Sequence, residues 1–477
     1  MAGMLQFPKV EQDYPEKRSA GERAGDFAEI ARAFAVTQAE EQSSRCSQCG
    51  VPYCTTHCPL HNHIPDWLRL TAEGRLREAY ELSNATSTMP EICGRICPQD
   101  RLCEGNCVIE FTGHGAVTIG SVEKFITDTA WEQGWVEPLV PGPARGMSVG
   151  VIGAGPAGLT VADLMRARGY DVHVYDRHDR MGGLLTYGIP GFKLEKHVVA
   201  RRVDRLRDGG VVFHDGFEVG RDATLEELRA RHDAIVIATG VYRPRAIKAP
   251  GVDAAGVVEA IDYLTASNRK GFGDAVPAFD DGTLDATGKH VVVVGGGDTA
   301  MDCVRTAVRQ GAASVRCLYR RDRANMPGSQ REVKNAEEEG VEFVWLSAPE
   351  AFHGTDVVEG VQVFKMRLGE PDASGRRAPE VDPGAEYRLD ADLVIKALGF
   401  DAEELPRLFD APDLVVTRWG TVRLDHRTMM TSMDGVFAAG DIVRGASLVV
   451  WAVRDGRDVA ERMHDWLKAR AKVKEAA

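Results

Sequence analysis

The 477-residue sequence has no long hydrophobic run and no excess of positive charge. Its longest apolar stretches, residues 291–294 and 447–453, are far shorter than the roughly 18 residues that suggest a membrane-spanning helix. The N-terminus lacks the basic start and apolar run of a secretory signal. With 58 Lys and Arg against 71 Asp and Glu, the net charge of −13 disfavours binding to nucleic acid or to an anionic membrane. We therefore expect a cytoplasmic protein with no nucleic-acid or membrane partner.

Cysteine is scarce in the last three quarters of the chain, which contain only Cys303 and Cys317. The remaining eight of the ten cysteines lie between Cys46 and Cys107. Disulfides are rare in a reducing compartment. A group of cysteines this dense therefore indicates metal binding or redox chemistry. A purely structural role for these thiols is a weaker explanation, because eight buried cysteines within 62 positions would be an unusual way to fill a hydrophobic core.

The clustered cysteines form two groups, with the spacings CxxCxxxxCxxxCP and CxxxCPxxxxCxxxC. Zinc sites favour paired CxxC motifs or Cys/His quartets, and only one CxxC occurs here. Iron–sulfur clusters fit better, because thiolates are soft ligands for iron and a run that ends in Cys-Pro is typical of bacterial ferredoxins. The two groups therefore predict two [4Fe-4S] clusters.

In two-cluster ferredoxins the proline-flanked cysteine of one run binds the other cluster. Such an exchange assigns the first cluster to Cys46, Cys49, Cys54 and Cys107. It assigns three ligands of the second cluster to Cys58, Cys97 and Cys103. The fourth ligand is either Cys93, by residue type, or the carboxylate of Glu123. Three nearby histidines are further candidates, but surface histidines outnumber ligands, so we expect them at the surface: His57, His61 and His63.

The segment between the two cysteine groups, residues 64–86, carries apolar residues at broadly helical spacing. Residues 132–146 contain Pro138, Pro141 and Pro143, which is typical of a linker. We expect residues 1–146 to form a small all-α domain around its clusters.

A complete dinucleotide-binding pattern follows the linker. A short apolar strand enters GAGPAG at residues 153–158, a helix follows, and a second strand ends at Asp176, 23 residues after Gly153. The first glycine permits the turn, the second, Gly155, lets a pyrophosphate approach the backbone, and the third, Gly158, allows close helix packing. The acid at the end of the second strand suits a ribose hydroxyl.

The pattern recurs where the valine strand 291–294 enters GGGDTA, with Ala300 in place of the third glycine. The next strand runs into Arg320 and Arg321, where an acid would be expected for NAD. A guanidinium there is a bidentate partner for a 2′-phosphate, which favours NADP(H), and Arg323 is a further cation nearby.

Two dinucleotide turns in one chain indicate two nucleotides, so the turn with Asp176 is free to hold FAD. Strands at 235–240 and 394–400 end in small residues, which suits places where the chain crosses between domains. A late strand ends in Gly440 and Asp441, which can present a carboxylate and backbone amides to a flavin.

These patterns predict an α/β protein with an N-terminal all-α iron–sulfur domain followed by two Rossmann-like, doubly wound nucleotide-binding domains. We expect the FAD domain to comprise residues 147–245 and 400–477. The NADPH domain, residues 246–399, is then inserted into it.

The chain closely resembles the small (β) subunits of NADPH-dependent glutamate synthase. The resemblance rests on CSQCGVPYCTTHCP, EICGRICPQDRLCEGNC, GAGPAG, DRMGGLLTYGIPGFKL, IATG, GGGDTAMDC and FAAGDIVRGAS, and it spans nearly the whole chain. The cysteine-rich and flavin part is also similar to dihydropyrimidine dehydrogenase and to NADPH:ferredoxin oxidoreductases. The related dehydrogenase has a non-cysteine cluster ligand at the position of Glu123, which favours Glu123 over Cys93.

The resemblance also implies two sets of nucleotide-binding residues. Those for FAD are Gly153, Gly155, Gly158, Asp176, Gly183, Leu184, Lys193, Thr239, Gly240, Gly440 and Asp441. Those for NADPH are Gly295, Gly297, Asp298, Thr299, Arg320 and Arg321.

The function implied is that of an electron-input subunit. NADPH would deliver a hydride to FAD, and electrons would leave singly through the clusters to a large (α) subunit that carries FMN and makes L-glutamate from L-glutamine and 2-oxoglutarate. We expect no essential acid or base, because hydride transfer chiefly requires positioning. Cys303 and Cys317 form no CxxC dithiol, so the clusters are the expected exit. The resemblance therefore implies that this chain forms a hetero-oligomer with the large subunit.

Two alternatives remain. The chain could be a free-standing NADPH:ferredoxin-type oxidoreductase, or a non-catalytic scaffold whose nucleotide sites only stabilise an assembly. The intact Gly, Asp and Arg positions of both turns count against the scaffold.

Overall fold

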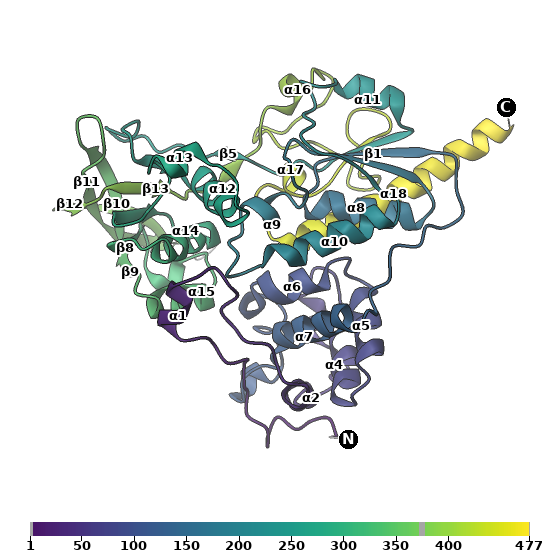
Figure 1. Ribbon diagram of the computed structural model, residues 1–477, viewed down its shortest axis with the longest axis horizontal. Helices are drawn as coiled ribbons and strands as arrows, with labels where there is room; N and C mark the ends of the chain where they lie inside the picture. Colours follow the sequence, from purple (N-terminus) through teal and green to yellow (C-terminus); the bar gives the residue numbers. More distant parts are fainter. Residues whose placement is uncertain (1–2, 372–376, 477) are drawn as a thin grey trace.

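The computed structural model describes residues 3–371 and 377–476. Figure 1 shows a helical N-terminal domain beneath two α/β domains that lie side by side. No helix in these described ranges is long and apolar enough to cross a membrane.

The N-terminal domain is helical, as predicted. Its α-helices are α1 (Ala20–Ala24), α2 (Val36–Ser44), α3 (Tyr53–Thr56), α4 (Ile64–Ala72), α5 (Leu76–Asn84), α6 (Pro90–Ile96) and α7 (Ile119–Glu132), with short 3-10 turns at Gln99–Arg101 and Glu110–Thr112. The apolar spacing of residues 64–86 forms α4 and α5, and the fully buried Trp67 anchors their core. Residues 133–147 contain no helix or strand, which agrees with a linker.

The first α/β domain contains a parallel sheet in the order β15-β4-β1-β2-β3. Its strands are β1 (Ser148–Ile152), β2 (Asp171–Tyr175), β3 (Val212–His214), β4 (Ala234–Ile237) and β15 (Val436–Ala438). Its helices are α8 (Pro156–Ala167), α9 (Leu184–Tyr187), α10 (Lys196–Asp208), α11 (Leu225–Arg231), α16 (Leu405–Leu408), α17 (Asp441–Arg444) and α18 (Val449–Ala476). Near-continuous apolar strands such as Ala234–Ile237 form because both faces of a parallel sheet are covered.

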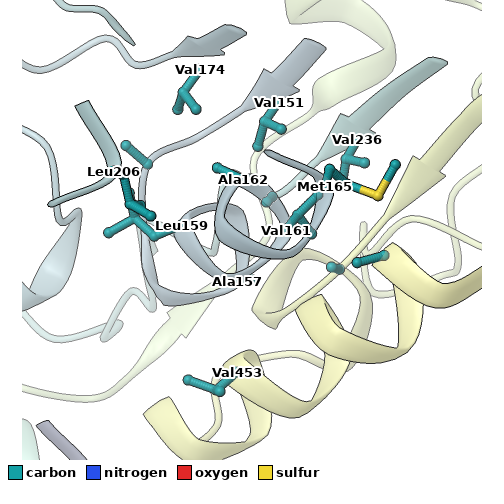
Figure 2. Close-up of a cluster of buried hydrophobic side chains, with 14 of the residues drawn as sticks. Val151, Ala157, Leu159, Val161, Ala162, Met165, Val174, Leu206, Val236 and Val453 are labelled. Atoms are coloured by element: carbon teal, nitrogen blue, oxygen red, sulfur yellow. The ribbon is translucent and has the colours of Figure 1, made fainter. Parts of the chain in front are cut away.

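The core of this domain lies between the sheet and α8. Figure 2 shows Val151, Val174 and Val236 on neighbouring strands above α8, with Val453 of α18 on the far side of that helix. The helices α8 and α18 approach closely, because Gly456 has no side chain where a Cβ would lie 2.6 Å from the Ala157 carbonyl oxygen. α18 therefore becomes part of the nucleotide-binding layer.

The second α/β domain repeats this plan with the parallel strand order β6-β13-β7-β8-β9. Its strands are β6 (Val257–Glu259), β7 (His290–Val294), β8 (Ser314–Tyr319), β9 (Glu342–Trp345) and β13 (Leu393–Lys396). Its helices are α12 (Ala260–Gly271), α13 (Pro277–Asp280), α14 (Asp298–Arg309) and α15 (Gln330–Glu338), with a 3-10 turn at Arg323–Asn325.

The second domain is inserted between β4 and β15 of the first, as predicted. The chain leaves through β5 (Arg243–Pro244) and returns through β14 (Phe400–Asp401), and these two strands pair antiparallel. The fold class expected from the sequence is thereby confirmed.

An antiparallel sheet was not predicted. It consists of β10 (Ser347–His353), β11 (Gly360–Pro371) and β12 (Arg377–Asp390), and it projects from the second domain (Figure 1).

Candidate functional site

A cavity of about 480 Å³ opens at the carboxyl ends of β1, β4 and β15 in the first α/β domain. Ligands bind at this edge in doubly wound folds. Nine of the residues predicted to bind FAD line it: Gly153, Gly155, Asp176, Gly183, Leu184, Thr239, Gly240, Gly440 and Asp441. The structure therefore brings together residues spread over almost 300 positions of the chain.

The turn after β1 has the geometry that its glycines predict. Gly153 has a φ of +104°, and a Cβ there would lie 2.4 Å from the Ala238 carbonyl oxygen. Gly158 does not line the cavity, and a Cβ on it would lie 1.9 Å from the Gly153 oxygen, so it allows the close packing expected of the third glycine. A Cβ on Gly155 would meet no described atom within 4 Å. This open space at the N-terminus of α8 fits a pyrophosphate.

Two carboxylates and a hydroxyl supply polarity to the cavity wall. Asp176 accepts hydrogen bonds from the Ala154 amide at 2.7 Å and from the His178 amide and ring Nδ1 at 2.9 Å each. Burial raises the pKa of Asp441, although the Ser447 hydroxyl donates to it at 2.6 Å. The buried Thr239 hydroxyl has no partner among the described residues. Acceptors and a free hydroxyl at this place fit the polyol and ribose of a flavin dinucleotide.

Lys193 lies outside the cavity, unlike most of its predicted set. Its Nζ is 2.8 Å from Asp302 Oδ1 and 3.8 Å from Glu332 Oε2, both on the second α/β domain. Burial alone would lower the pKa of Lys193, but these two carboxylates outweigh it and the pKa is raised. Lys193 therefore bridges the two domains.

The dinucleotide turn of the second α/β domain lies at the edge of the cavity in the first α/β domain. Thr299, on the first turn of α14, lines the large cavity together with Gly155 and Leu184. A Cβ on Gly297 would again meet no described atom within 4 Å, which leaves room for a pyrophosphate. A nucleotide on this turn thus lies next to the first cavity.

Two of the other predicted NADPH residues have distinct surroundings. Asp298 Oδ1 accepts a hydrogen bond from the Ser329 amide at 3.0 Å. At the first position of the turn, a Cβ on Gly295 would lie 2.3 Å from the Ala397 carbonyl oxygen. The close packing of β7 on β13 therefore requires glycine at the entry to the turn.

The arginines that follow β8 differ in their burial and in their partners. Arg320 is exposed, whereas Arg321 is buried and its Nε has no partner among the described residues. Arg323 is already engaged, at 2.7 Å from Glu337. A buried guanidinium nitrogen with no partner calls for an anion, so this corner fits a 2′-phosphate.

The structure brings the first predicted cluster set together. Cys46, Cys49, Cys54 and Cys107 line one small cavity in the helical domain. Burial raises the pKa of Cys46 to about 11 and that of Cys54 to about 12. Buried thiols of this kind lose their protons when a metal compensates the thiolate charge, so the donor set fits iron.

The second set also converges, with both candidates for its fourth ligand. The pKa values of Cys58, Cys97 and Cys103 are all raised, for Cys58 and Cys103 mainly by burial and for Cys97 by the neighbouring Cys93 thiol and by burial, and the nearby Glu123 carboxylate raises each of them further. Burial raises the pKa of Glu123, and its Oε1 is 3.5 Å from Asn62 Nδ2. The choice between Cys93 and Glu123 stays a prediction.

The described ranges contain no group of three or more His, Cys, Asp or Glu side chains close enough to bind one metal ion. A [4Fe-4S] cluster needs a wider spacing, because each ligand binds a different corner of the cubane. His57, His61 and His63 are exposed. All ten cysteines lie in the described ranges and are free, with Cys303 and Cys317 fully buried in the core of the second domain.

Sequence reasoning missed much of the cavity wall. Arg177 and Tyr242 line it with their side chains stacked, the guanidinium 4.7 Å from the ring centre, and Arg177 also lies 3.0 Å from Glu403. Arg177 directly follows Asp176, and residues after the second strand face the nucleotide in this pattern, so it had a signal. The segments 217–221 and 403–409, the second of which contains α16, carry no sequence signal for the site.

Two family models match the chain. Residues 23–135 match dihydropyrimidine dehydrogenase domain II, 4Fe-4S cluster, and residues 147–456 match pyridine nucleotide-disulphide oxidoreductase. The solved structure of Mycobacterium tuberculosis FprA in complex with NADPH has the same fold, with a TM-score of 0.59 and 19% identity over 69% of this chain and 87% of that one. The two family matches define a pyridine nucleotide oxidoreductase with an iron–sulfur domain.

Two relatives are more specific. The Azospirillum brasilense glutamate synthase [NADPH] small chain is 67% identical over 98% of this chain and 97% of its own length. The Escherichia coli glutamate synthase [NADPH] small chain is 45% identical over 98% of this chain and 99% of its own. The chain belongs to the glutamate synthase [NADPH] small-chain family, which confirms the resemblance seen in the sequence.

Proposed function

We propose that this chain is the electron-input subunit of a glutamate synthase. It oxidises NADPH at FAD and passes electrons singly through two [4Fe-4S] clusters. A large subunit that carries FMN receives them and makes L-glutamate from L-glutamine and 2-oxoglutarate. The observation that carries the proposal is the position of α18, which contacts both the flavin cavity and the loop that follows Cys58.

The start of α18 forms one wall of the cavity through Val449 and Ala452. Two residues further, Arg454 Nη1 donates to the Pro59 carbonyl oxygen at 2.8 Å. Arg457 donates to the Leu60 oxygen at 3.3 Å. At about 1.5 Å rise per residue, Ala452 and Arg454 are only about 3 Å apart along the helix axis. This proximity supports direct electron transfer between the cavity and the second cysteine set.

The packing of the cysteines supports an order for the clusters. Cys58, Cys93 and Cys97 pack with the core of the flavin domain. Cys58 also packs with the core of the helical domain, to which Cys103 of the second set belongs. Of the first set, Cys46, Cys54 and Cys107 contact the helical core and not the core of the flavin domain. Electrons from the flavin would therefore reach the second cluster first and the first cluster next.

The chain's own residues position the two nucleotides. The open spaces at Gly155 and Gly297 receive the pyrophosphates, and Arg321 takes the 2′-phosphate. Thr299 belongs to the proposed NADPH turn and also lines the proposed flavin cavity, which supports a site where the nicotinamide would be held next to the flavin. The bound flavin supplies the chemistry, since it accepts a hydride and returns electrons one at a time.

The surface beside the first cysteine set is apolar. Tyr53 and Val108 line its cavity and are 49% and 36% exposed, and their chain neighbours Val51 and Phe111 are 68% and 74% exposed. Apolar side chains gathered at an exposed site favour a protein partner. We assign this surface, defined by these four residues, to the large subunit, because an exit cluster must lie next to its acceptor.

Reconstitution tests the proposal. The purified chain should oxidise NADPH with an artificial dye, and addition of the large subunit should create NADPH oxidation that requires both glutamine and 2-oxoglutarate. Dye reduction without any such dependence would favour a free-standing NADPH:ferredoxin-type oxidoreductase. Absence of dye reduction by a flavin- and iron-loaded chain would favour the scaffold.

The same assay tests the exit surface. Tyr53→Ser with Phe111→Ser should leave dye reduction unchanged and weaken activation by the large subunit. Trp419→Ser is the matched control, because Trp419 is 67% exposed on the flavin domain. Equal loss in both variants would contradict the assignment.

A further inference from the structure

The loop between β8 and α15 connects the NADPH turn to the iron–sulfur domain. What we call the connecting loop comprises residues 326–329 together with the first two residues of α15, Gln330 and Arg331. On one side it packs on the dinucleotide turn, where the Gly328 amide donates to the Gly296 oxygen at 3.0 Å and the Ser329 amide donates to Asp298 at 3.0 Å. A Cβ on Gly328 would lie 3.2 Å from that same Gly296 oxygen, so the contact is close.

On its other side the connecting loop is tied to the helical domain. The Ser329 hydroxyl lies 3.2 Å from both carboxylate oxygens of Asp100, and Arg101 Nη1 donates to the Pro327 oxygen at 2.5 Å. Arg331 forms an ion pair with the buried Glu104 and donates to the Tyr14 hydroxyl at 2.6 Å. The two ends and the middle of the loop are thus all held by the domain that contains the cysteines.

Asp298 links the connecting loop to the expected pyrophosphate site. It is the first residue of α14, at the helix end that a pyrophosphate should occupy. A carboxylate at this end competes with a phosphate for the same amides and repels it. The Ser329 amide donates to Asp298 Oδ1, and the hydroxyl of the same residue donates to Asp100.

We propose that Asp100 and Ser329 are positioning residues for NADPH, through which the iron–sulfur domain orders the nucleotide turn. Asp100 fixes Ser329, Ser329 engages the Asp298 carboxylate, and the turn is left free to bind the pyrophosphate. The inference rests on the proposed NADPH site at α14. It implies that the NADPH domain depends on the helical domain for its affinity.

Ser329→Ala and Asp100→Ala in the full-length holoprotein test the inference. Each should raise the KM for NADPH in dye reduction about tenfold, as expected for one lost hydrogen bond to a charged group, while kcat stays within about twofold. Calorimetric titration with NADP⁺ should give a matching loss of affinity. The double variant should be no worse than either single one, because both remove the same contact.

Three further variants control for general damage. Ser329→Thr keeps the hydroxyl and should restore the KM. Ser314→Ala removes a surface hydrogen bond to His290 at the opposite end of β8 and should have no effect. Lys17→Ala removes an interdomain ion pair with Glu338 without touching the connecting loop, and should also leave the KM unchanged.

An unchanged KM in Ser329→Ala, additive effects in the double variant, or an equal rise in Lys17→Ala would overturn the inference. These outcomes leave the proposed function intact, provided that the unaltered chain reduces the dye with NADPH. If the unaltered, loaded chain oxidises no NADPH, the proposed function itself fails.

Discussion

At the scale of single residues, the guanidinium of Arg321 is the clearest mark of coenzyme choice. It is buried, and its Nε has no partner in the described part of the chain. Burial of an unpaired polar nitrogen is costly, so an anion beside this residue would stabilise it. Arg320 lies next to it at the surface.

Arg320→Ala with Arg321→Ala should therefore raise the KM for NADPH by about tenfold to a hundredfold, because one or two charge-assisted hydrogen bonds are lost. The KM for NADH should change little. Steady-state dye reduction with both coenzymes measures this. Arg316→Ala is the control, since Arg316 lies on the same strand and pairs with Glu342 at 2.9 Å. An equal rise for both coenzymes would contradict the assignment.

A second point at the scale of single residues is whether Cys93 or Glu123 is the fourth ligand of the second cluster. Both lie beside Cys97, but an uncompensated buried carboxylate is far more costly than a buried thiol, which packs as a small apolar group. Glu123 is 9% exposed and has no cationic partner among its described neighbours, so iron is the compensation we expect.

We predict that Cys93→Ala keeps two full clusters and that Glu123→Ala perturbs one. Iron counting and electron paramagnetic resonance measure the outcome. Cys303→Ala, a buried thiol in the other core, should behave like the unaltered chain. Loss of one cluster signal in Cys93→Ala alone would assign the ligand to Cys93.

At the scale of elements, the outer strands of the flavin sheet carry a group of histidines. His173 on β2 lies 3.1 Å from the ring of His214 on β3, and His232 follows α11 with its ring centre 5.1 Å from that of His173. The charged and titratable groups that face them are Asp171, Tyr175, Asp215 and Arg231. Burial, together with the two neighbouring imidazoles, lowers the pKa of His232 to about 4.

This group predicts a loss of stability in mild acid. The unfolded chain takes up the His232 proton below its ordinary pKa near 6.5, whereas the folded chain resists it until about pH 4. The contribution of His232 is therefore full above pH 6.5 and is lost as the pH drops toward 4, and its size stays below the roughly 3 kcal/mol of a fully buried ring because solvent screens this half-buried one. Denaturant unfolding at pH 7.5 and 5.0 should show a smaller difference in His232→Gln. His197→Gln, at an exposed histidine, should keep the full difference.

Some of the helices and strands could be predicted from the sequence and others could not. The strands around both glycine turns, Val291–Val294 above all, were predictable because a buried parallel strand and its turn leave a local signature. β10, β11 and β12 were not, because polar residues alternate irregularly along them and their pairing is decided by tertiary contact.

The sites follow the same rule. The clustering of the cysteines was predictable because their spacing is local, and their roles as ligands stay a prediction. Lys193 was assigned to the flavin by the family resemblance, and it lies at the domain boundary, paired with Asp302. The cavity wall at residues 403–409, which include α16, carries no pattern, since these residues lie about 250 positions after the first turn and meet it only after folding.

At the scale of the whole molecule, charged pairs hold the three domains together. One deeply buried pair joins the helical domain to the flavin domain: Arg202 of α10 contacts both carboxylate oxygens of Glu91 at 2.7 Å, and both side chains are at most 2% exposed. Such bidentate geometry fixes the relative orientation of the two domains.

Arg202→Met should cost roughly 3–5 kcal/mol of stability, because it leaves the Glu91 carboxylate buried without a partner. Denaturant unfolding measures the loss. The pair Glu91→Leu with Arg202→Met should recover most of it. Arg207→Met, which breaks an exposed pair with Asp204, should cost at most about 1 kcal/mol. A similar loss in all three variants would show that the interface does not depend on this pair.

The pairing of β5 with β14 has a consequence for the origin of the molecule. The inserted NADPH domain begins and ends at hydrogen-bonded neighbours, Pro244 and Phe400. An insertion of this kind adds a module without stretching or reordering any strand of the host sheet. The junction is thus a natural exchange point, at which a short turn in place of residues 246–399 leaves a flavin and cluster carrier that must draw its electrons from another donor.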